Sequence, residues 1–347
     1  MRSLALPGGL VALALGSCAA PAAGELGHLS DWDLFLDPAN QVPAPGVIPY
    51  EINAPLFSDH ASKHRFLRVP EGTTITIEAD GSWSFPEGTV IVKTFGFLLD
   101  GRDPSLGEQL VETRLLVRED GRWVPYVYRW NDEETDAVRM PAGDRVEVAF
   151  VDASGEAHEI TYRVPNVNQC ANCHGGTGEI EPLGLRTDQM DHLFDFGAGP
   201  ENQIDHLAAL GLLSAPPAAE RTTLTDYTDE SAPLEARARA YLHANCSHCH
   251  RDGGAADQSG LWLNIEITEP VRLGICKPPA AAGRGTGGRS VAIWPGDSER
   301  SIMTFRMASE EPGIKMPELP TVLSHDEGVA LITAWIDAME PADCASP

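Results

Sequence analysis

Two short segments of the chain share one spacing, and this spacing constrains the fold more than any other feature. Residues 170–174 read CANCH and residues 246–250 read CSHCH. In a CxxCH segment the two thiols can form thioethers with the two vinyl groups of a haem, and the histidine that follows can bind the iron. The chain therefore predicts two covalently attached haem c groups, with thioethers at Cys170, Cys173, Cys246 and Cys249 and proximal ligands at His174 and His250.

Zinc is the competing interpretation of these segments. CxxC pairs with nearby histidines also form structural zinc sites. Such sites do not require a histidine directly after the second cysteine, whereas both segments have one. The pattern thus favours haem and an extracytoplasmic protein.

The N-terminus supports export from the cytoplasm. Met1 and Arg2 precede an apolar stretch that runs to Leu15 and is too short to cross a bilayer, as is typical of a signal peptide. Residues 15–18 read LGSC, the pattern of a bacterial lipoprotein signal, so we expect residues 1–18 to form the signal and Cys18 to carry the lipid. The alternative is an ordinary secretory signal cleaved near residues 20–23. We expect a periplasmic protein attached to the outer membrane only through this lipid.

Two cysteines remain after these assignments, Cys276 and Cys344. Outside the cytoplasm a disulfide between them is favoured, with two separate buried thiols as the alternative.

The charge of the chain bears on its partners. It contains 51 acidic and 25 basic residues, with a formal net charge of −26. Such a surface repels nucleic acid and anionic lipid and attracts basic proteins, so we expect basic redox partners and no nucleic acid. The charge could equally serve only to keep the protein soluble.

The first half of the chain predicts a tether followed by a β-rich domain. Residues 19–47 are rich in proline, alanine and glycine, as expected of a tether. Over 48–165 several short segments carry alternating or β-branched residues and are predicted strands: 73–77, 89–95, 109–117, 123–130, 145–151 and 159–164. Turn dipeptides at 80–81, 120–121 and 154–155 predict hairpins. The expected fold is an antiparallel β sandwich or barrel.

Residues 166–231 are expected to hold the first haem segment and a linker. No helical pattern precedes residue 170, so the first haem should hang from the edge of the β domain. A short amphipathic helix is expected over 201–213, and the polar run after Pro216 and Pro217 is typical of a linker.

Residues 232–347 carry a different pattern. A helix begins near Pro233 and runs into Cys246, a Met316-Pro317 pair lies in a later loop, and residues 324–327 read as a capping box that opens an apolar helix containing Trp335. This arrangement resembles a class I cytochrome c domain. The resemblance implies that Met316 is the distal ligand opposite His250, ahead of its rivals Met303 and Met307.

The chain from about residue 48 onward also resembles a family of bacterial diheme c-type cytochromes of unassigned role. The matching segments are 53–59, 92–95, 164–166, 261–263 and 276–279. The family implies electron transfer, and a parallel β-helix repeat protein is a candidate partner. The expected fold class is α+β multidomain, with the β domain followed by a mainly α cytochrome c-like domain.

The distal ligand of the first haem is the least constrained feature. Met190 is our choice, ahead of His192 and of the more distant Met140, His60, His64 and His206. An open position is the alternative, and it would favour a diheme oxidoreductase of the peroxidase kind over an electron carrier. A third hypothesis is a binding module built on the β domain. His60 and His64 have the spacing of a metal-binding helix face, but no carboxylate partner is evident.

Overall fold

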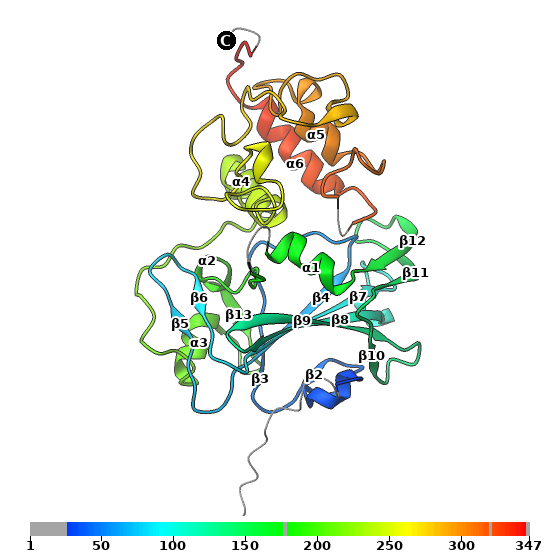
Figure 1. Ribbon diagram of the computed structural model, residues 1–347, viewed down its shortest axis with the longest axis vertical. Helices are drawn as coiled ribbons and strands as arrows, with labels where there is room; N and C mark the ends of the chain where they lie inside the picture. The colour runs from blue at the N-terminus through cyan, green and yellow to red at the C-terminus, as the bar shows by residue number, and fades with distance from the viewer. Residues whose placement is uncertain (1–25, 176–178, 319–320, 345–347) are drawn as a thin grey trace, which may run out of the picture.

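The computed structural model describes residues 26–175, 179–318 and 321–344. It confirms an α+β protein with an antiparallel sheet in its N-terminal half and a few helices in its C-terminal half. The strands form one lobe, the later helices form a second lobe, and α1 lies between them (Figure 1).

The strands are β1 Phe35–Asp37, β2 Val42–Pro43, β3 Val47–Pro49, β4 Ser62–Arg68, β5 Thr76–Ile77, β6 Trp83–Ser84, β7 Val90–Leu98, β8 Glu108–Glu119, β9 Arg122–Trp130, β10 Ala137–Arg139, β11 Asp144–Val151, β12 Ala157–Val164, β13 Leu193–Asp195 and β14 Pro200–Asn202. The α-helices are α1 Val167–His174, α2 Thr187–Met190, α3 Gln203–Ala209, α4 Leu234–Cys246, α5 Ile302–Met307 and α6 Asp326–Asp337. Short 3-10 helices are η1 Leu29–Trp32, η2 Pro104–Leu106, η3 Asp257–Ser259, η4 Gly283–Thr286 and η5 Ser298–Arg300.

The main sheet has six antiparallel strands in the order β10-β9-β8-β7-β4-β3. Its longest hairpin, β8–β9, turns at Asp120 and Gly121, which have φ angles of 51° and 76°. Two consecutive positive φ angles give the tight turn that matches the twist of the strands, which is why the Asp-Gly pair fixes this register. Glu119 consequently pairs with Arg122.

The sheet is open and not a closed barrel. Within the described residues β3 and β10 are its two edges. The separate β11–β12 hairpin packs Phe150 and Tyr162 against Phe95 and Phe97 of β7, so it adds a second layer over part of one face. The β lobe is thus a sheet with a partial cover.

Residues 26–47 are not a tether, contrary to our prediction. Leu26, Leu29, Trp32 and Leu34 are buried against the sheet, and the Trp32 indole donates a 2.6 Å hydrogen bond to the Tyr128 hydroxyl. Burial of each large apolar side chain contributes about 1.5–3 kcal/mol, which outweighs the effect of the prolines and glycines nearby. The predicted signal, the lipidation site Cys18 and residues 19–25 lie outside the described residues.

In the C-terminal lobe, α4 and α6 pack against each other. A side chain at Gly328 of α6 would clash with the Tyr241 ring of α4, so glycine permits this close contact. The predicted capping box does not form. The N-cap residue is His325, and the Ser324 hydroxyl bonds to the Asp326 carboxylate at 2.7 Å instead of a backbone N–H.

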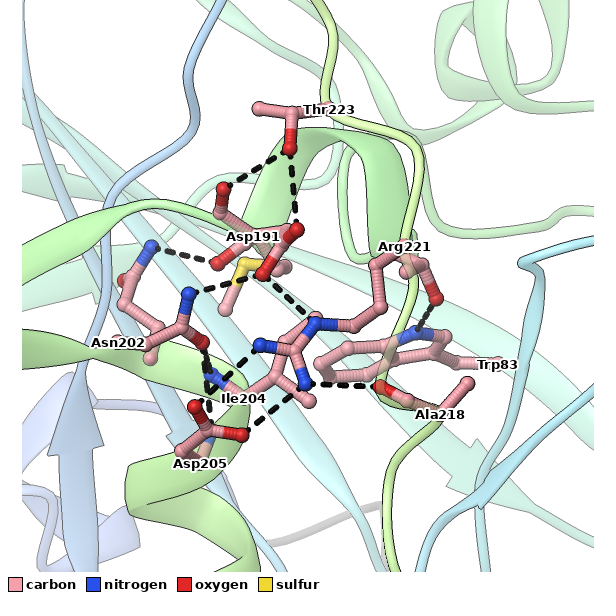
Figure 2. Close-up of polar contacts among 11 residues, drawn as sticks. Trp83, Asp191, Asn202, Ile204, Asp205, Ala218, Arg221 and Thr223 are labelled. Atoms are coloured by element: carbon pink, nitrogen blue, oxygen red, sulfur yellow. Dashed lines mark hydrogen bonds and ion pairs between the residues drawn. The ribbon is translucent and has the colours of Figure 1, made fainter.

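The predicted linker is bound along its length to the rest of the molecule. Arg221 donates to Asp191 at 2.7 Å and to Asp205 at 3.0 Å, so it joins the linker to the segments around α2 and α3 (Figure 2). Further along, Leu224 and Tyr227 are buried among apolar residues of the helical lobe. The linker therefore holds the two lobes in a fixed relation.

A disulfide joins Cys276 to Cys344, with 5.0 Å between their Cα atoms. Among the described residues, no helix is both long enough and apolar enough to cross a membrane.

Candidate functional site

Each CxxCH segment has its main cavity, and the two cavities share part of their lining. The sheet cavity, of about 530 Å³, lies between α1 and the main sheet and contains Cys170, Cys173 and His174. The helical cavity, of about 540 Å³, lies in the C-terminal lobe and contains Cys246, Cys249 and His250. Both volumes fall in the range of sites for small molecules and cofactors.

The first segment is carried by a helix that we did not predict. Strand β12 ends before Pro165, and Asn166 then caps α1 by accepting a 3.1 Å hydrogen bond from the Gln169 N–H, while the Gln169 side chain accepts one from the Asn166 N–H at 3.0 Å. This reciprocal pair is a capping box. The signal was present in the sequence as Asn and Gln three residues apart, directly ahead of Cys170.

The two motif histidines are oriented in the same way. Nδ1 of His174 lies 2.7 Å from the carbonyl oxygen of Glu181, and Nδ1 of His250 lies 3.2 Å from the Ser259 hydroxyl. A proton on Nδ1 leaves Nε2 as the ligand atom, the arrangement common in metal-binding histidines. Burial lowers the pKa of each imidazole to about 4, which keeps both rings neutral and able to bind a metal at pH 7.

The helical cavity contains sulfur ligands besides the motif. Met303, Met307 and Met316 all line it together with His250. The loop that carries Met316 is held by a 2.9 Å hydrogen bond from its N–H to the carbonyl of Arg306. The structure thus brings the predicted distal ligand and both of its rivals to one cavity.

Met190 lies elsewhere. It is 1% exposed in an apolar cluster with Trp83, Ile204 and Leu207, and it lines neither cavity. His192 contacts the carbonyl of Glu51 and also lies outside both cavities. Among the described residues, the sheet cavity is lined by no methionine, and its imidazoles are His174 and His248. Short separation along the chain did not bring Met190 to His174, because α2 buries it in the core.

The sheet cavity is basic although the protein is strongly acidic. Its lining includes the basic residues Arg65, Lys93, Arg114, Arg145 and Arg163 and one acidic residue, Asp144. Arg65 pairs with Glu51 at 2.6 Å and Arg114 with the fully buried Glu112 at 2.8 Å.

Lys93 differs from these two arginines. It forms no ion pair with a carboxylate among the residues that the structure describes. Burial, followed by repulsion from Arg65 and Lys63, lowers the pKa of Lys93 well below its usual value. A half-buried amine next to other cations favours an anionic group in the cavity. The sequence could not show this, because the basic residues are spread over about a hundred positions.

The two cavities meet at the motifs. Cys173 and His248 line both of them, and the Cys249 thiol donates to the carbonyl of Asn172 at 3.5 Å. Ligand atoms of Cys173, His248 and Cys249 all lie within 4.8 Å of one another. As free thiols these residues could hold a metal such as zinc, whereas thioether formation would occupy both sulfurs.

No family model matches the chain, and no curated protein or solved structure matches it. The functional assignment therefore depends on the motifs and on the geometry of the two cavities.

Proposed function

We propose that the protein transfers electrons outside the cytoplasm through two covalently bound haem c groups, one in each cavity. The observation that carries this proposal is the junction between the motifs. The sulfur atoms of Cys173 and Cys249 belong to different CxxCH motifs and lie within 4.8 Å of each other where the two cavities meet. Thioethers formed at these sulfurs would hold the edges of two haems side by side, as rapid transfer between them requires.

The residues present fit these groups. In the sheet cavity, Cys170 and Cys173 would provide the thioethers and His174 the proximal ligand. In the helical cavity, Cys246, Cys249 and His250 would do the same, with Met316 as the distal ligand. When bound, each haem would supply one-electron Fe(III)/Fe(II) chemistry. Residues 232–340 would then form a domain of the class I cytochrome c kind.

The basic lining of the sheet cavity fits the two propionates of a haem. Arg65 and Arg114 are already paired with Glu51 and Glu112. Lys93 is left without a carboxylate among the described residues, and Arg145 and Arg163 stand at the same cavity. A propionate beside Lys93 would supply the missing anion and favour the charged form of the amine.

Location and partners follow from the sequence. We propose a periplasmic lipoprotein anchored through Cys18 to the outer membrane. Its net charge of −26 favours basic redox partners, and a parallel β-helix repeat protein is a candidate.

One observation favours a second function. The described lining of the sheet cavity contains no methionine, and Met190 is buried elsewhere. An iron held there by His174 with its sixth position open would suit a diheme oxidoreductase of the peroxidase kind.

Absorption and spin-state measurements, combined with intact mass, test both functions. Two covalent haems, both low-spin, with weak carbon monoxide binding, would support electron transfer. One high-spin haem that binds carbon monoxide stoichiometrically, with peroxide turnover, would support the oxidoreductase. A chain that carries no haem, or carries zinc at the motifs, would refute both.

A further inference from the structure

A second group of candidate ligands lies in the β lobe, away from the CxxCH motifs. His60 precedes β4, Asp152 directly follows β11, and His158 belongs to β12. Their ligand atoms all lie within 4.8 Å of one another. The fold thus supplies the carboxylate that the sequence did not place beside His60, and it brings in His158 in place of His64.

The carboxylate of this group is fixed in place. Oδ1 of Asp152 accepts hydrogen bonds from the Ser154 N–H at 2.8 Å, the Ser154 hydroxyl at 2.7 Å and the Glu156 N–H at 2.9 Å. Its other oxygen, Oδ2, lies 2.9 Å from Nε2 of His158. Oδ1 is therefore held by hydrogen bonds from the following turn, and Oδ2 faces the His158 imidazole.

The two imidazoles are also oriented by their neighbours. The His158 ring stacks on Phe150 with 5.0 Å between centroids, and the His60 ring lies 5.5 Å from His158 at an angle of 23°. Among the described residues, no hydrogen bond to a ring nitrogen of His60 is present. Its nitrogens are thus free to bind a ligand.

The backbone at His60 is held in an unfavourable conformation. His60 and the preceding Asp59 have φ angles of 61° and 53°, each of which costs about 1–2 kcal/mol for a residue with a side chain. The buried Asp59 carboxylate accepts hydrogen bonds from the N–H groups of Val322 and Leu323, at 2.8 and 2.9 Å, and so secures the turn against the helical lobe.

We propose that His60, Asp152 and His158 bind a divalent transition-metal ion. Two imidazoles and one carboxylate form a ligand set suited to zinc and to other first-row metals, with further positions open to water. Bonds of about 2.0–2.1 Å in a tetrahedral site put ligand atoms ~3.4 Å apart. The His158–Asp152 pair, at 2.9 Å, would therefore separate slightly, and small side-chain movements within the 4.8 Å group would complete the site.

The site would adjoin the helical cavity. The Phe57 ring lies 5.0 Å from His60 and stacks at 4.1 Å on His325, and both Phe57 and His325 line that cavity. The metal proposal itself does not depend on haem, since none of its three ligands belongs to a CxxCH motif.

Zinc titration of the purified full-length protein, after EDTA treatment and dialysis, tests the proposal. Free thiols are first alkylated with iodoacetamide, which closes the Cys173–His248–Cys249 group if no haem is attached. Calorimetry should show one zinc ion bound per chain, and zinc should raise the Tm. In H60N and D152N the affinity should fall at least tenfold and the zinc-dependent rise in Tm should disappear.

These variants are chosen to preserve the local structure. Asparagine tolerates the left-handed backbone of His60, and at position 152 it keeps an oxygen to accept the hydrogen bonds at Oδ1. H64N is the matched control, because His64 pairs instead with Glu108 at 2.9 Å, and it should bind zinc as the parent does. If a variant has a lower Tm without zinc, H158Q provides the second test. Absence of binding in the parent, or equal affinity in H60N and H64N, would overturn the proposal.

Discussion

The sheet cavity and the helical cavity carry the same attachment motif in opposite surroundings. The sheet cavity has five basic residues in its described lining and no methionine, whereas the helical cavity has three methionines. Their volumes are nearly equal, so size does not distinguish them. The motif specifies attachment and the proximal ligand, while the surrounding fold determines the charge and the sixth ligand.

In the proposed function this difference would give the two haems separately adjustable potentials. Thioether ligation raises a haem potential by favouring ferrous iron. A nearby positive charge has the same effect through space, because it disfavours the added charge of ferric iron. In the helical cavity a methionine thioether would raise the haem potential, and in the sheet cavity the basic side chains would do so.

The largest expected effect comes from removing the motif cysteines of one cavity at a time. The double variant C170A/C173A should lose the sheet-cavity haem and keep the other, and C246A/C249A should do the reverse. Intact mass after denaturation, compared with the parent at two haems, measures this directly. Loss of both haems from either double variant would show that the two sites do not load independently.

The next test concerns the sulfur ligand of the helical cavity. M316A should abolish the weak absorption band of an iron–methionine bond and lower the potential of one haem only. M303A should keep that band and mainly reduce stability, by at most about 2–5 kcal/mol, since the side chain is only half-buried. If the band is lost in M303A and retained in M316A, Met303 is the distal ligand and Met316 is not.

The helical cavity should also make the stability sensitive to acid. Burial lowers the pKa of His325 from 6.5 to about 4, so the neutral ring is favoured in the folded state. The free energy of unfolding should therefore be highest above pH 6.5, where this ring is neutral in both states. It should fall by about 3 kcal/mol in total as the pH drops toward 4, because the unfolded state then binds a proton that the folded state does not.

The variant H325F tests this contribution. Phenylalanine should keep the stack on Phe57 and flatten the dependence of the unfolding free energy on pH between 6.5 and 4. Denaturant titrations of parent and variant at several pH values measure the difference. Identical pH profiles would exclude His325 as the source.

The smallest expected effect concerns the charge of the sheet cavity. K93M removes a cation, which at roughly 8 Å and an effective dielectric constant of about 20 is worth ~2 kcal/mol. This corresponds to a fall of ~90 mV in the potential of the sheet-cavity haem. Redox titration should show the shift in one haem, whereas the control K277M, which alters the lining of the helical cavity, should leave that haem unchanged. A rise in the potential of the sheet-cavity haem, or an equal fall in the potentials of both haems, would contradict the placement of Lys93.

The sequence predicted those strands whose pattern and turns agree. Strands β8 and β9 were predicted because alternation is clear and an Asp-Gly turn joins them. Strand β4 was missed, although it lies inside the sheet. Its residues read SKHRFLR and do not alternate, because Arg65, Phe66 and Leu67 are buried in succession. The burial of Arg65 depends on its ion pair with Glu51, fourteen positions earlier, which the strand itself does not reveal.

The functional residues show a similar limit. The CxxCH segments were predicted because each carries its chemistry within five positions. The rest of both cavities is assembled from distant segments, such as those that carry Lys93 and His174 at the sheet cavity. The error over Met190 has the same origin, since local spacing cannot tell a core residue from a ligand.

The segment that carries Phe57 and Asp59 limits how far the C-terminal lobe can be treated as a portable module. The Phe57 N–H donates to Asn245 at 2.7 Å, its ring forms part of the helical cavity, and Asp59 binds the backbone that leads into α6. Residues 232–347 produced alone would lose one wall of their cavity and the support of that loop. Transplanting this lobe into another protein would therefore require residues 53–60 to be moved with it.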